Sequence, residues 1–344
     1  MIEYVTFSVL VCFLLMCGYA FRSTTIIYIT LIVLISFMGL RSEVGTDYPA
    51  YVEQYERLSY PLDITRGKEV GYTLMSYFNK YILGLEYQSV FLFCAFFSIF
   101  FVYASVSRNK SFFFVCFGLF LYVFAGFYTQ SFNIIRQSLG MAICLYALNF
   151  VYQKKPVKFF LLVSLASSFH ITSLLMAPVY FFANRRLNKK SMVLILCISI
   201  FTGSVVVNIL GSLFEHLGFR YAKFFLHNGD DVTSGTGLMQ LVTLSLCLFS
   251  IYHSHLISKK YLVYFNVFFL FCVFNLVFIN FNLGIRAVQV YKIALIVFIP
   301  YLFSLFSGYS KFLILLVCAV YYVGFIRYLA GSTNIIPYAF NLSF

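Results

Sequence analysis

The sequence contains very little charge. Only 10% of its 344 residues are Asp, Glu, Lys or Arg, whereas 62% are hydrophobic and the mean hydropathy is +0.92. So little polar surface cannot cover a water-soluble globule, but it suits a chain that a lipid bilayer surrounds. Apolar runs that can cross the ~30 Å hydrocarbon core recur from end to end. The sequence therefore predicts an all-α, polytopic membrane helix bundle, with residues 1–344 forming a single transmembrane domain.

Sequence patterns that bind nucleotides or metals are also absent. The chain has no P-loop, HExxH, GxSxG or CxxC pattern. Its nine cysteines all lie inside apolar runs and do not cluster with histidines, which is typical of small buried hydrophobic residues. We therefore predict no metal site and no cofactor, and expect side chains alone to perform any catalysis.

The distribution of charge predicts how the chain sits in the membrane. The net charge is +13, but the basic residues form short clusters between apolar runs, which favours a topology signal over binding of nucleic acid. Alternate loops hold basic residues and no acidic ones: Arg22; Arg108 and Lys110; Lys154, Lys155 and Lys158; Arg185, Arg186, Lys189 and Lys190; Lys259 and Lys260; Lys311. Because basic loops stay cytoplasmic, both termini and the two large loops, 41–71 and 211–237, are predicted to be external.

About twelve apolar segments make up the predicted bundle. They are Tyr4–Ala20, Thr24–Leu40, Gln88–Val106, Phe112–Tyr128, Gln137–Tyr152, Phe159–Ser168, Leu174–Phe182, Ser191–Leu210, Leu238–Tyr252, Tyr261–Ile279, Ala287–Phe306 and Phe312–Tyr328. The sixth and seventh are too short to cross the membrane separately, at ~1.5 Å per residue. They form either a re-entrant hairpin with Ser167, Ser168 and His170 at its tip, or one long crossing. A single crossing would place the basic residues at 185–190 outside, so charge favours the hairpin.

Polar side chains gather at the predicted external ends of two segments. Asn133, Arg136 and Gln137 have the spacing of one helical face, and the spacing of Arg286 and Lys292 places them on a common arc of another helix. Ionisable groups at membrane depth are costly and usually mark a functional path. Helix capping and snorkelling of long side chains towards the membrane surface are the alternative explanations.

The first external loop combines carboxylates with aromatic rings. Glu43, Asp47 and Glu69 accompany several tyrosines there, including Tyr48 and Tyr51. Rings can stack on sugars while carboxylates accept hydroxyl hydrogen bonds, although solvated loop charge explains part of this pattern.

Three arginines lie at predicted external helix ends. Arg41, Arg136 and Arg286 would converge if their helices are neighbours, and a guanidinium fork matches phosphate oxygens. This arrangement suggests a lipid that carries pyrophosphate. His170 is the first candidate base, because an unperturbed pKa of ~6.5 suits proton transfer near neutrality, with Asp47 and Glu69 as alternatives. A hydrogen-bonded structural role for His170 remains open.

Several motifs resemble those of the EpsG family and the related Wzy-type O-antigen polymerases. In family order they are residues 41–49 (RSEVGTDYP) with Tyr51, residues 68–72 (KEVGY), residues 132–139 (FNIIRQSL), residues 169–173 (FHITS), Arg286 with Tyr291, and residues 336–338 (IPY). The resemblance implies a GT-C-like helical fold in a bacterial plasma (inner) membrane. It also implies polymerisation of undecaprenyl-pyrophosphate-linked repeat units at the external face, with a flippase and a chain-length regulator as partners.

This interpretation assigns a role to each candidate residue. His170, Asp47 and Glu69 are the catalytic candidates; Arg41, Arg136, Arg286 and Lys292 are expected to bind pyrophosphate; Glu43, Tyr48, Tyr51, Asn133, Gln137, Arg220 and Tyr291 are expected to bind sugar. Two other functions are compatible with the same features. One is a lipid-linked oligosaccharide flippase or transporter, and the other is an O-antigen ligase that uses similar chemistry on a different acceptor.

Overall fold

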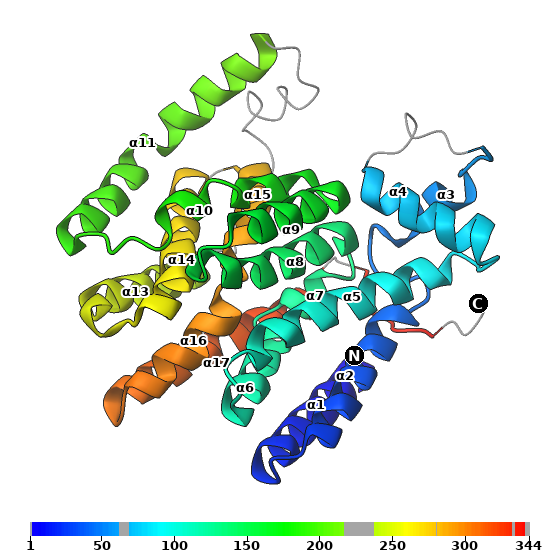
Figure 1. The fold of residues 1–344 in the computed structure, drawn as a ribbon, viewed down its shortest axis with the longest axis horizontal. Coiled ribbons are helices and arrows are strands. Elements are labelled where there is room, and N and C mark those ends of the chain that lie inside the picture. The colour runs from blue at the N-terminus through cyan, green and yellow to red at the C-terminus, as the bar shows by residue number, and fades with distance from the viewer. Residues whose placement is uncertain (1, 62–68, 217–236, 280, 332–333, 341–344) are drawn as a thin grey trace.

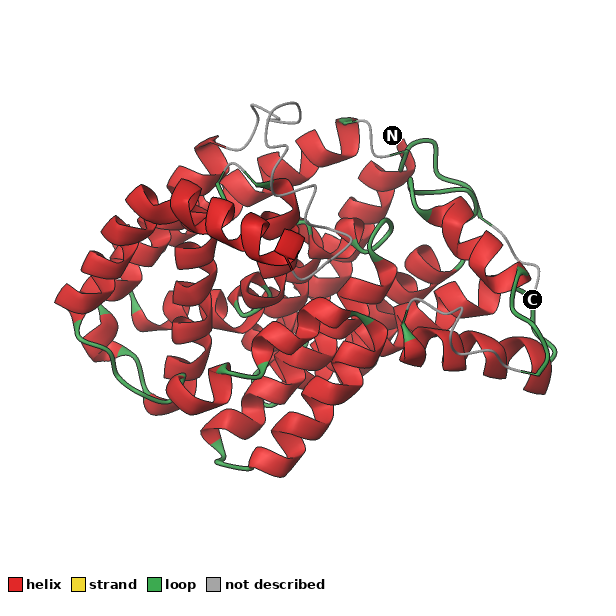
Figure 2. Cartoon of the chain, turned by 90° about the horizontal axis from the view of Figure 1, so that it is seen from above, coloured by secondary structure: helices red, strands yellow, loops and turns green. Residues whose placement is uncertain are grey.

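The computed structural model describes residues 2–61, 69–216, 237–279, 281–331 and 334–340, and within these ranges it contains helices and no strand (Figure 1, Figure 2). This confirms the predicted all-α class. The α-helices are α1 (Ile2–Ala20), α2 (Thr24–Gly39), α3 (Tyr48–Glu56), α4 (Val70–Tyr77), α5 (Gln88–Ser107), α6 (Phe112–Phe124), α7 (Phe127–Gln130), α8 (Ile135–Tyr152), α9 (Pro156–Phe169), α10 (Val179–Phe182), α11 (Lys189–His216), α13 (Gly237–Tyr252), α14 (Lys259–Val277), α15 (Asn282–Lys292), α16 (Leu295–Leu305) and α17 (Tyr309–Ala330). Most of the predicted loop 211–237 lies outside the described residues.

Each predicted apolar segment coincides with helix, but several segments are bent or divided. Helix α11, which holds the run 191–210, bends by 62° between Gly203 and Val205. The run 112–128 divides into α6 and α7 at Gly126, whose φ of 87° is a left-handed conformation that glycine adopts without strain. The run 287–306 divides into α15 and α16, which meet at an angle of 51°.

The number of complete membrane crossings stays a prediction. Among the described residues, α1, α5 and α14 are each long and apolar enough to cross a membrane, and the total is five if two bent pairs are counted as spans. Helices α2, α6, α9 and α13 are apolar but shorter. Helix α6, for example, has 13 residues and reaches only about 20 Å.

Helix α8 lies at the centre of the bundle, with 15 of its 18 residues buried. It packs against α5 and α9, so it has no face free for solvent. Peripheral helices differ, because α1 and α11 leave large apolar side chains such as Phe13 and Phe201 mostly exposed. Apolar surface of this kind is costly in water but suits contact with lipid.

The chain doubles back at His170. Helix α9 ends at Phe169, and a short 3₁₀ helix, η3 (Ile171–Met176), leads into α10. At the base of this hairpin, Asn184 Nδ2 donates to the carbonyl oxygen of Val151 at 2.6 Å, and the rings of Phe159 and Tyr180 lie 5.3 Å apart. These contacts confirm that the chain forms a hairpin and not one long helix, while its re-entrant placement in the membrane stays a prediction.

Segments from the predicted external loop fold onto one corner of the bundle, where α3 and α4 lie together (Figure 1). Helix α4 continues into a π-helical turn, η2 (Phe78–Ile82). Lys80 Nζ donates to the carbonyl oxygens of Tyr55, Glu56 and Leu58, at the C-terminal end of α3. A cation at this position is favourable because the last carbonyls of a helix carry partial negative charge. This contact joins the two helices that border the candidate site.

Candidate active site

Glu69 connects three separate elements of the fold. It precedes the first residue of α4, Arg136 is the second residue of α8, and His170 follows the last residue of α9. Glu69 Oε2 lies 2.7 Å from Arg136 Nη1, and Glu69 Oε1 lies 2.5 Å from His170 Nδ1. The side chains of Glu69, Arg136 and His170 are 11%, 19% and 25% exposed. Because water is partly excluded, their charges interact more strongly than those of a surface pair.

Two glycines allow these elements to approach one another. A Cβ atom at Gly71 would lie 2.3 Å from Ser168 Oγ and 3.0 Å from the Ser168 backbone carbon. A Cβ atom at Gly140 would lie 2.4 Å from Ser173 Oγ. Any larger residue at these positions would push α4 or α8 away from the hairpin, so the glycines position both partners of Glu69.

Two tyrosine rings flank Arg136. Its guanidinium carbon lies 5.3 Å from the ring centre of Tyr51 and 5.4 Å from that of Tyr72, within the range of cation–π attraction. Burial raises the pKa of Tyr51 to about 12, so its hydroxyl stays protonated at neutral pH and donates to the carbonyl oxygen of Asn133 at 3.2 Å. Among the described residues, the buried Nε of Arg136 has no hydrogen-bond partner. Glu69 and the two rings therefore hold Arg136 in place.

The contact with Glu69 determines which nitrogen of His170 can act as a base. A carboxylate only accepts hydrogen bonds, so the proton on the neutral ring belongs to Nδ1, which faces Glu69. Nε2 then carries the lone pair on the opposite side of the ring. An imidazole oriented in this way by a carboxylate is the arrangement used for general base catalysis.

Arg41 has a different environment from the predicted one. It is fully buried, and its guanidinium donates to the carbonyl oxygens of Met38, Val44 and Phe132. The group also lies 4.7 Å from the ring centre of Phe91. Since backbone carbonyls already occupy Nε, Nη1 and Nη2, this placement favours a structural role for Arg41, joining the first loop to α2 and to the segment before α8.

The other loop residues divide into buried and exposed ones. Tyr48 is buried, with its hydroxyl 3.3 Å from Gln88 Oε1 and its ring stacked on Phe91 at 4.6 Å. Glu43 and Asp47 are exposed, and Asp47 Oδ1 is 3.4 Å from Thr46 Oγ1. Of the three catalytic candidates, the structure thus brings Glu69 and His170 together, while Asp47 makes no described contact with them.

The predicted common face of Asn133, Arg136 and Gln137 is wrong, because α8 begins only at Ile135. Asn133 lies before the helix and accepts a hydrogen bond from the Thr46 backbone N–H at its Oδ1, at 2.7 Å. Gln137 is on the helix, but its Nε2 donates to the carbonyl oxygen of residue 286 at 2.7 Å. Gln137 therefore joins α8 to α15.

Three of the residues predicted to bind substrate belong to α15, and their surroundings differ. The side chain of Arg286 is exposed. Tyr291 is buried and donates through its hydroxyl to the carbonyl oxygen of Leu175 in η3 at 2.6 Å. Lys292 Nζ lies about equally far from the ring centres of Phe127 and Tyr321, at 5.5 and 5.3 Å. Arg220, which was expected to bind sugar, lies outside the described residues.

The sequence indicates no role for Gly71, and it indicates Tyr72 only as one of the tyrosines of a possible sugar-binding loop. Both follow Glu69 directly, in the KEVGY motif at residues 68–72, so the motif itself was the available signal. Their roles depend on contacts with Arg136 and Ser168, which are distant in sequence.

Comparison with known protein families matches residues 24–340, nearly the whole chain, to the EpsG family. Comparisons with curated proteins and with solved structures found no match. The family and the apolar helices together indicate a multi-pass membrane protein of the polysaccharide polymerase type. On the extent of this match, the chain belongs to the EpsG family.

Proposed function

We propose that the chain is a glycosyltransferase that polymerises undecaprenyl-pyrophosphate-linked oligosaccharide repeat units into O-antigen or a similar surface polysaccharide. The reaction takes place at the external face of the bacterial plasma membrane, in a GT-C-like bundle that works with a flippase and a chain-length regulator. Membership of the EpsG family supports the reaction class. The observation that supports the site most directly is the contact of Glu69 with both His170 and Arg136.

His170 is the proposed base. A hydroxyl of one lipid-linked repeat attacks the anomeric carbon of the growing chain, and the bond from that carbon to the pyrophosphate oxygen breaks. The hydroxyl proton passes to His170 Nε2, and the bonding electrons leave with undecaprenyl pyrophosphate. Glu69 holds the imidazole through Nδ1 and stabilises the imidazolium that forms.

Arg136 is the proposed ligand of the leaving pyrophosphate, with Arg286 as a second cation. A guanidinium near the scissile bond stabilises the negative charge that develops on the leaving oxygen. Glu69 and the rings of Tyr51 and Tyr72 fix the orientation of Arg136 before substrate binds. Gln137 fixes α15, and thereby the base of the Arg286 side chain, against α8.

The proposed reaction is independent of metal. Within the described part of the chain, no group of three or more His, Cys, Asp or Glu side chains could hold a metal ion. Arginine takes the part that a divalent ion plays in other pyrophosphate-releasing enzymes.

Deletion of the gene, followed by sizing of the surface polysaccharide, tests this function. A polymerase is expected to leave single repeats attached to the cell while long chains disappear, and the intact gene is expected to restore them. Complete loss of surface polysaccharide would instead support the flippase or the ligase.

A further inference from the structure

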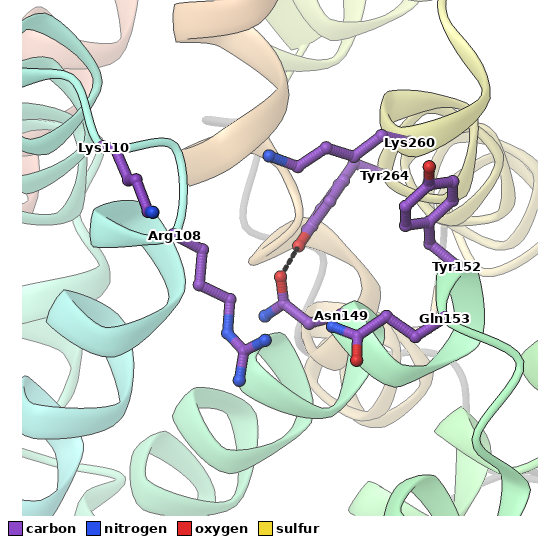
Figure 3. Close-up of a pocket in the computed structure, with 7 residues that line it drawn as sticks. All are labelled: Arg108, Lys110, Asn149, Tyr152, Gln153, Lys260 and Tyr264. Atoms are coloured by element: carbon purple, nitrogen blue, oxygen red, sulfur yellow. Dashed lines mark hydrogen bonds between the residues drawn. The ribbon is translucent and has the colours of Figure 1, made fainter.

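A polar cavity lies far from Glu69, at the other end of α8. Its volume is about 340 Å³, within the range of small-molecule sites, about 300 to 1,000 Å³. Arg108 and Lys110 reach it from the turn between α5 and α6, Lys260 from the start of α14, and Gln153 from the end of α8 (Figure 3). Arg136 and Gln153 are separated by about 25 Å along the helix axis, at 1.5 Å per residue. The cavity is therefore distinct from the candidate active site.

The three cations that line this cavity have only neutral partners. Arg108 Nη2 donates to the hydroxyl of Tyr146 at 2.7 Å, and Lys260 Nζ donates to Asn109 Oδ1 at 2.5 Å. Lys110 is exposed. In the described ranges, no carboxylate forms an ion pair with Arg108, Lys110 or Lys260. Three like charges around one cavity repel one another unless an anion enters it.

Retention of basic loops in the cytoplasm does not explain this geometry by itself. A topology signal needs positive charge only somewhere in the loop. Here the three side chains come from two segments far apart in sequence, the α5–α6 turn and the start of α14. They border the same space, together with polar groups that can bind a ligand (Figure 3). Asn149 and Tyr264 form part of the wall, and Tyr264 donates from its hydroxyl to Asn149 Oδ1 at 3.1 Å. This hydrogen bond fixes the amide so that its polar atoms hold one orientation.

We propose that this cavity binds the phosphate group of an anionic ligand, with Arg108, Lys110 and Lys260 as its cationic contacts. Two sources offer this chemistry. One is the headgroup of an anionic phospholipid, because basic pockets between the ends of membrane helices suit such headgroups. The other is a soluble phosphate compound that enters from the aqueous side. The inference does not depend on the proposed polymerase activity, since none of the residues involved contacts Glu69, Arg136 or His170.

The test uses the full chain purified in a neutral detergent, with its thermal unfolding midpoint as the readout. One arm adds phosphatidylglycerol, with phosphatidylcholine as the neutral comparison, and the other arm adds inorganic pyrophosphate. We expect at least one of the two anions to raise the midpoint in a saturable way. Stabilisation by phosphatidylglycerol alone identifies a headgroup site. Because Arg136 is itself a proposed ligand of pyrophosphate, stabilisation by pyrophosphate identifies a site for soluble phosphate compounds at this cavity only where the cavity variants below weaken it.

Variants then show whether the cavity is the site. Lys110→Gln removes an exposed charge, so folding is expected to persist, and the apparent affinity should fall about tenfold, as for one charge-assisted contact. Arg108→Gln should weaken binding further. Lys259→Gln is the matched control, because Lys259 is the neighbour of Lys260 but does not line the cavity. Absence of stabilisation by both anions, or equal weakening by Lys259→Gln and Lys110→Gln, would overturn the proposal.

Discussion

Glu69 and His170 are 101 positions apart in the sequence, yet the carboxylate Oε1 of one lies 2.5 Å from the Nδ1 of the other. The same carboxylate also pairs with Arg136. One acidic side chain thus orients both the proposed base and the proposed ligand of the leaving group. Removal of Glu69 is expected to disturb both functions at once, whereas removal of either partner should disturb one.

The first prediction concerns the proposed base. His170→Ala should lower the rate of polymerisation by about a hundredfold to ten thousandfold, the usual contribution of general base catalysis. Glu69→Gln should lower the rate of polymerisation at least as much, because the neutral amide neither stabilises the imidazolium of His170 nor neutralises Arg136. The measurement is the rate of chain extension by purified protein supplied with lipid-linked repeats.

A surface carboxylate provides the control for this experiment. Glu53 pairs with Arg57 at 2.5 Å, but their side chains are 57% and 77% exposed, so the pair should contribute little. Glu53→Gln is therefore expected to keep normal activity. Normal extension by His170→Ala would exclude His170 as the base and transfer that role to Glu69 or Asp47.

The second prediction concerns the close approach at Gly71. Gly71→Ala places a methyl group against Ser168, so α4 must shift away from the hairpin and move Glu69 with it. We expect a loss of stability of about 1 to 3 kcal/mol, as for overpacking, together with reduced activity. In the double variant, Ser168→Gly removes the nearest clashing atoms and should restore part of the lost stability and part of the lost activity.

Gly237→Ala is the comparison for Gly71→Ala, because a Cβ atom at Gly237 would meet nothing within 4 Å. Unfolding midpoints and chain extension are measured for all of these variants. If Gly71→Ala behaves like Gly237→Ala, the close packing does not position Glu69.

Much of the fold could be predicted because apolar runs and basic loops are local features. The hairpin at His170 is an example, since short apolar runs followed by the basic residues 185–190 predict it without knowledge of any tertiary contact. The break between α15 and α16 has no comparably clear local signal, so residues 287–306 were predicted as one segment.

The candidate site could be predicted only in part, for a physical reason. The sequence shows which ionisable side chains are costly to bury in a membrane. It does not show which other group pairs with each of them and offsets the free energy of burial. Arg41 directly follows the apolar helix α2 and Arg136 lies at the start of the apolar helix α8, so both are arginines at the end of an apolar helix. The structure gives Arg41 backbone carbonyls as partners and gives Arg136 a carboxylate and two rings. The difference arises from contacts that join distant parts of the chain.

The third prediction concerns orientation in the membrane. A membrane-impermeant thiol reagent applied to intact cells should label Glu56→Cys, an exposed residue of α3, and should not label Lys259→Cys at the start of α14. The unsubstituted chain, with its nine cysteines in apolar runs, gives the background. Labelling of Lys259→Cys from outside would reverse the predicted orientation.

The fourth prediction concerns metal ions. Chain extension by the purified protein should persist in EDTA, because arginine side chains are proposed to stabilise the leaving pyrophosphate. Activity that disappears with EDTA and returns with a divalent ion would refute a mechanism that depends on arginine alone.

The last prediction separates Arg136 from Arg286. Arg136 is partly buried and oriented by Glu69, Tyr51 and Tyr72, whereas the side chain of Arg286 is exposed. Lysine keeps the charge but loses the planar fork. Arg136→Lys should therefore cost about 1.5 to 3 kcal/mol in transition-state stabilisation, or roughly tenfold to a hundredfold in rate, and Arg136→Ala should cost more.

Substitution of Arg286 should have a smaller effect than substitution of Arg136, because water screens an exposed charge and no described contact fixes its side chain. Chain length is compared in cells that express Arg136→Lys, Arg136→Ala, Arg286→Lys or Arg286→Ala at matched protein levels, with Arg57→Ala as the surface control. Full-length polymer from either alanine variant removes that arginine from the mechanism. A larger loss at Arg286 than at Arg136 would mean that Arg136 serves mainly to hold Glu69 in place and that Arg286 is the principal ligand of pyrophosphate.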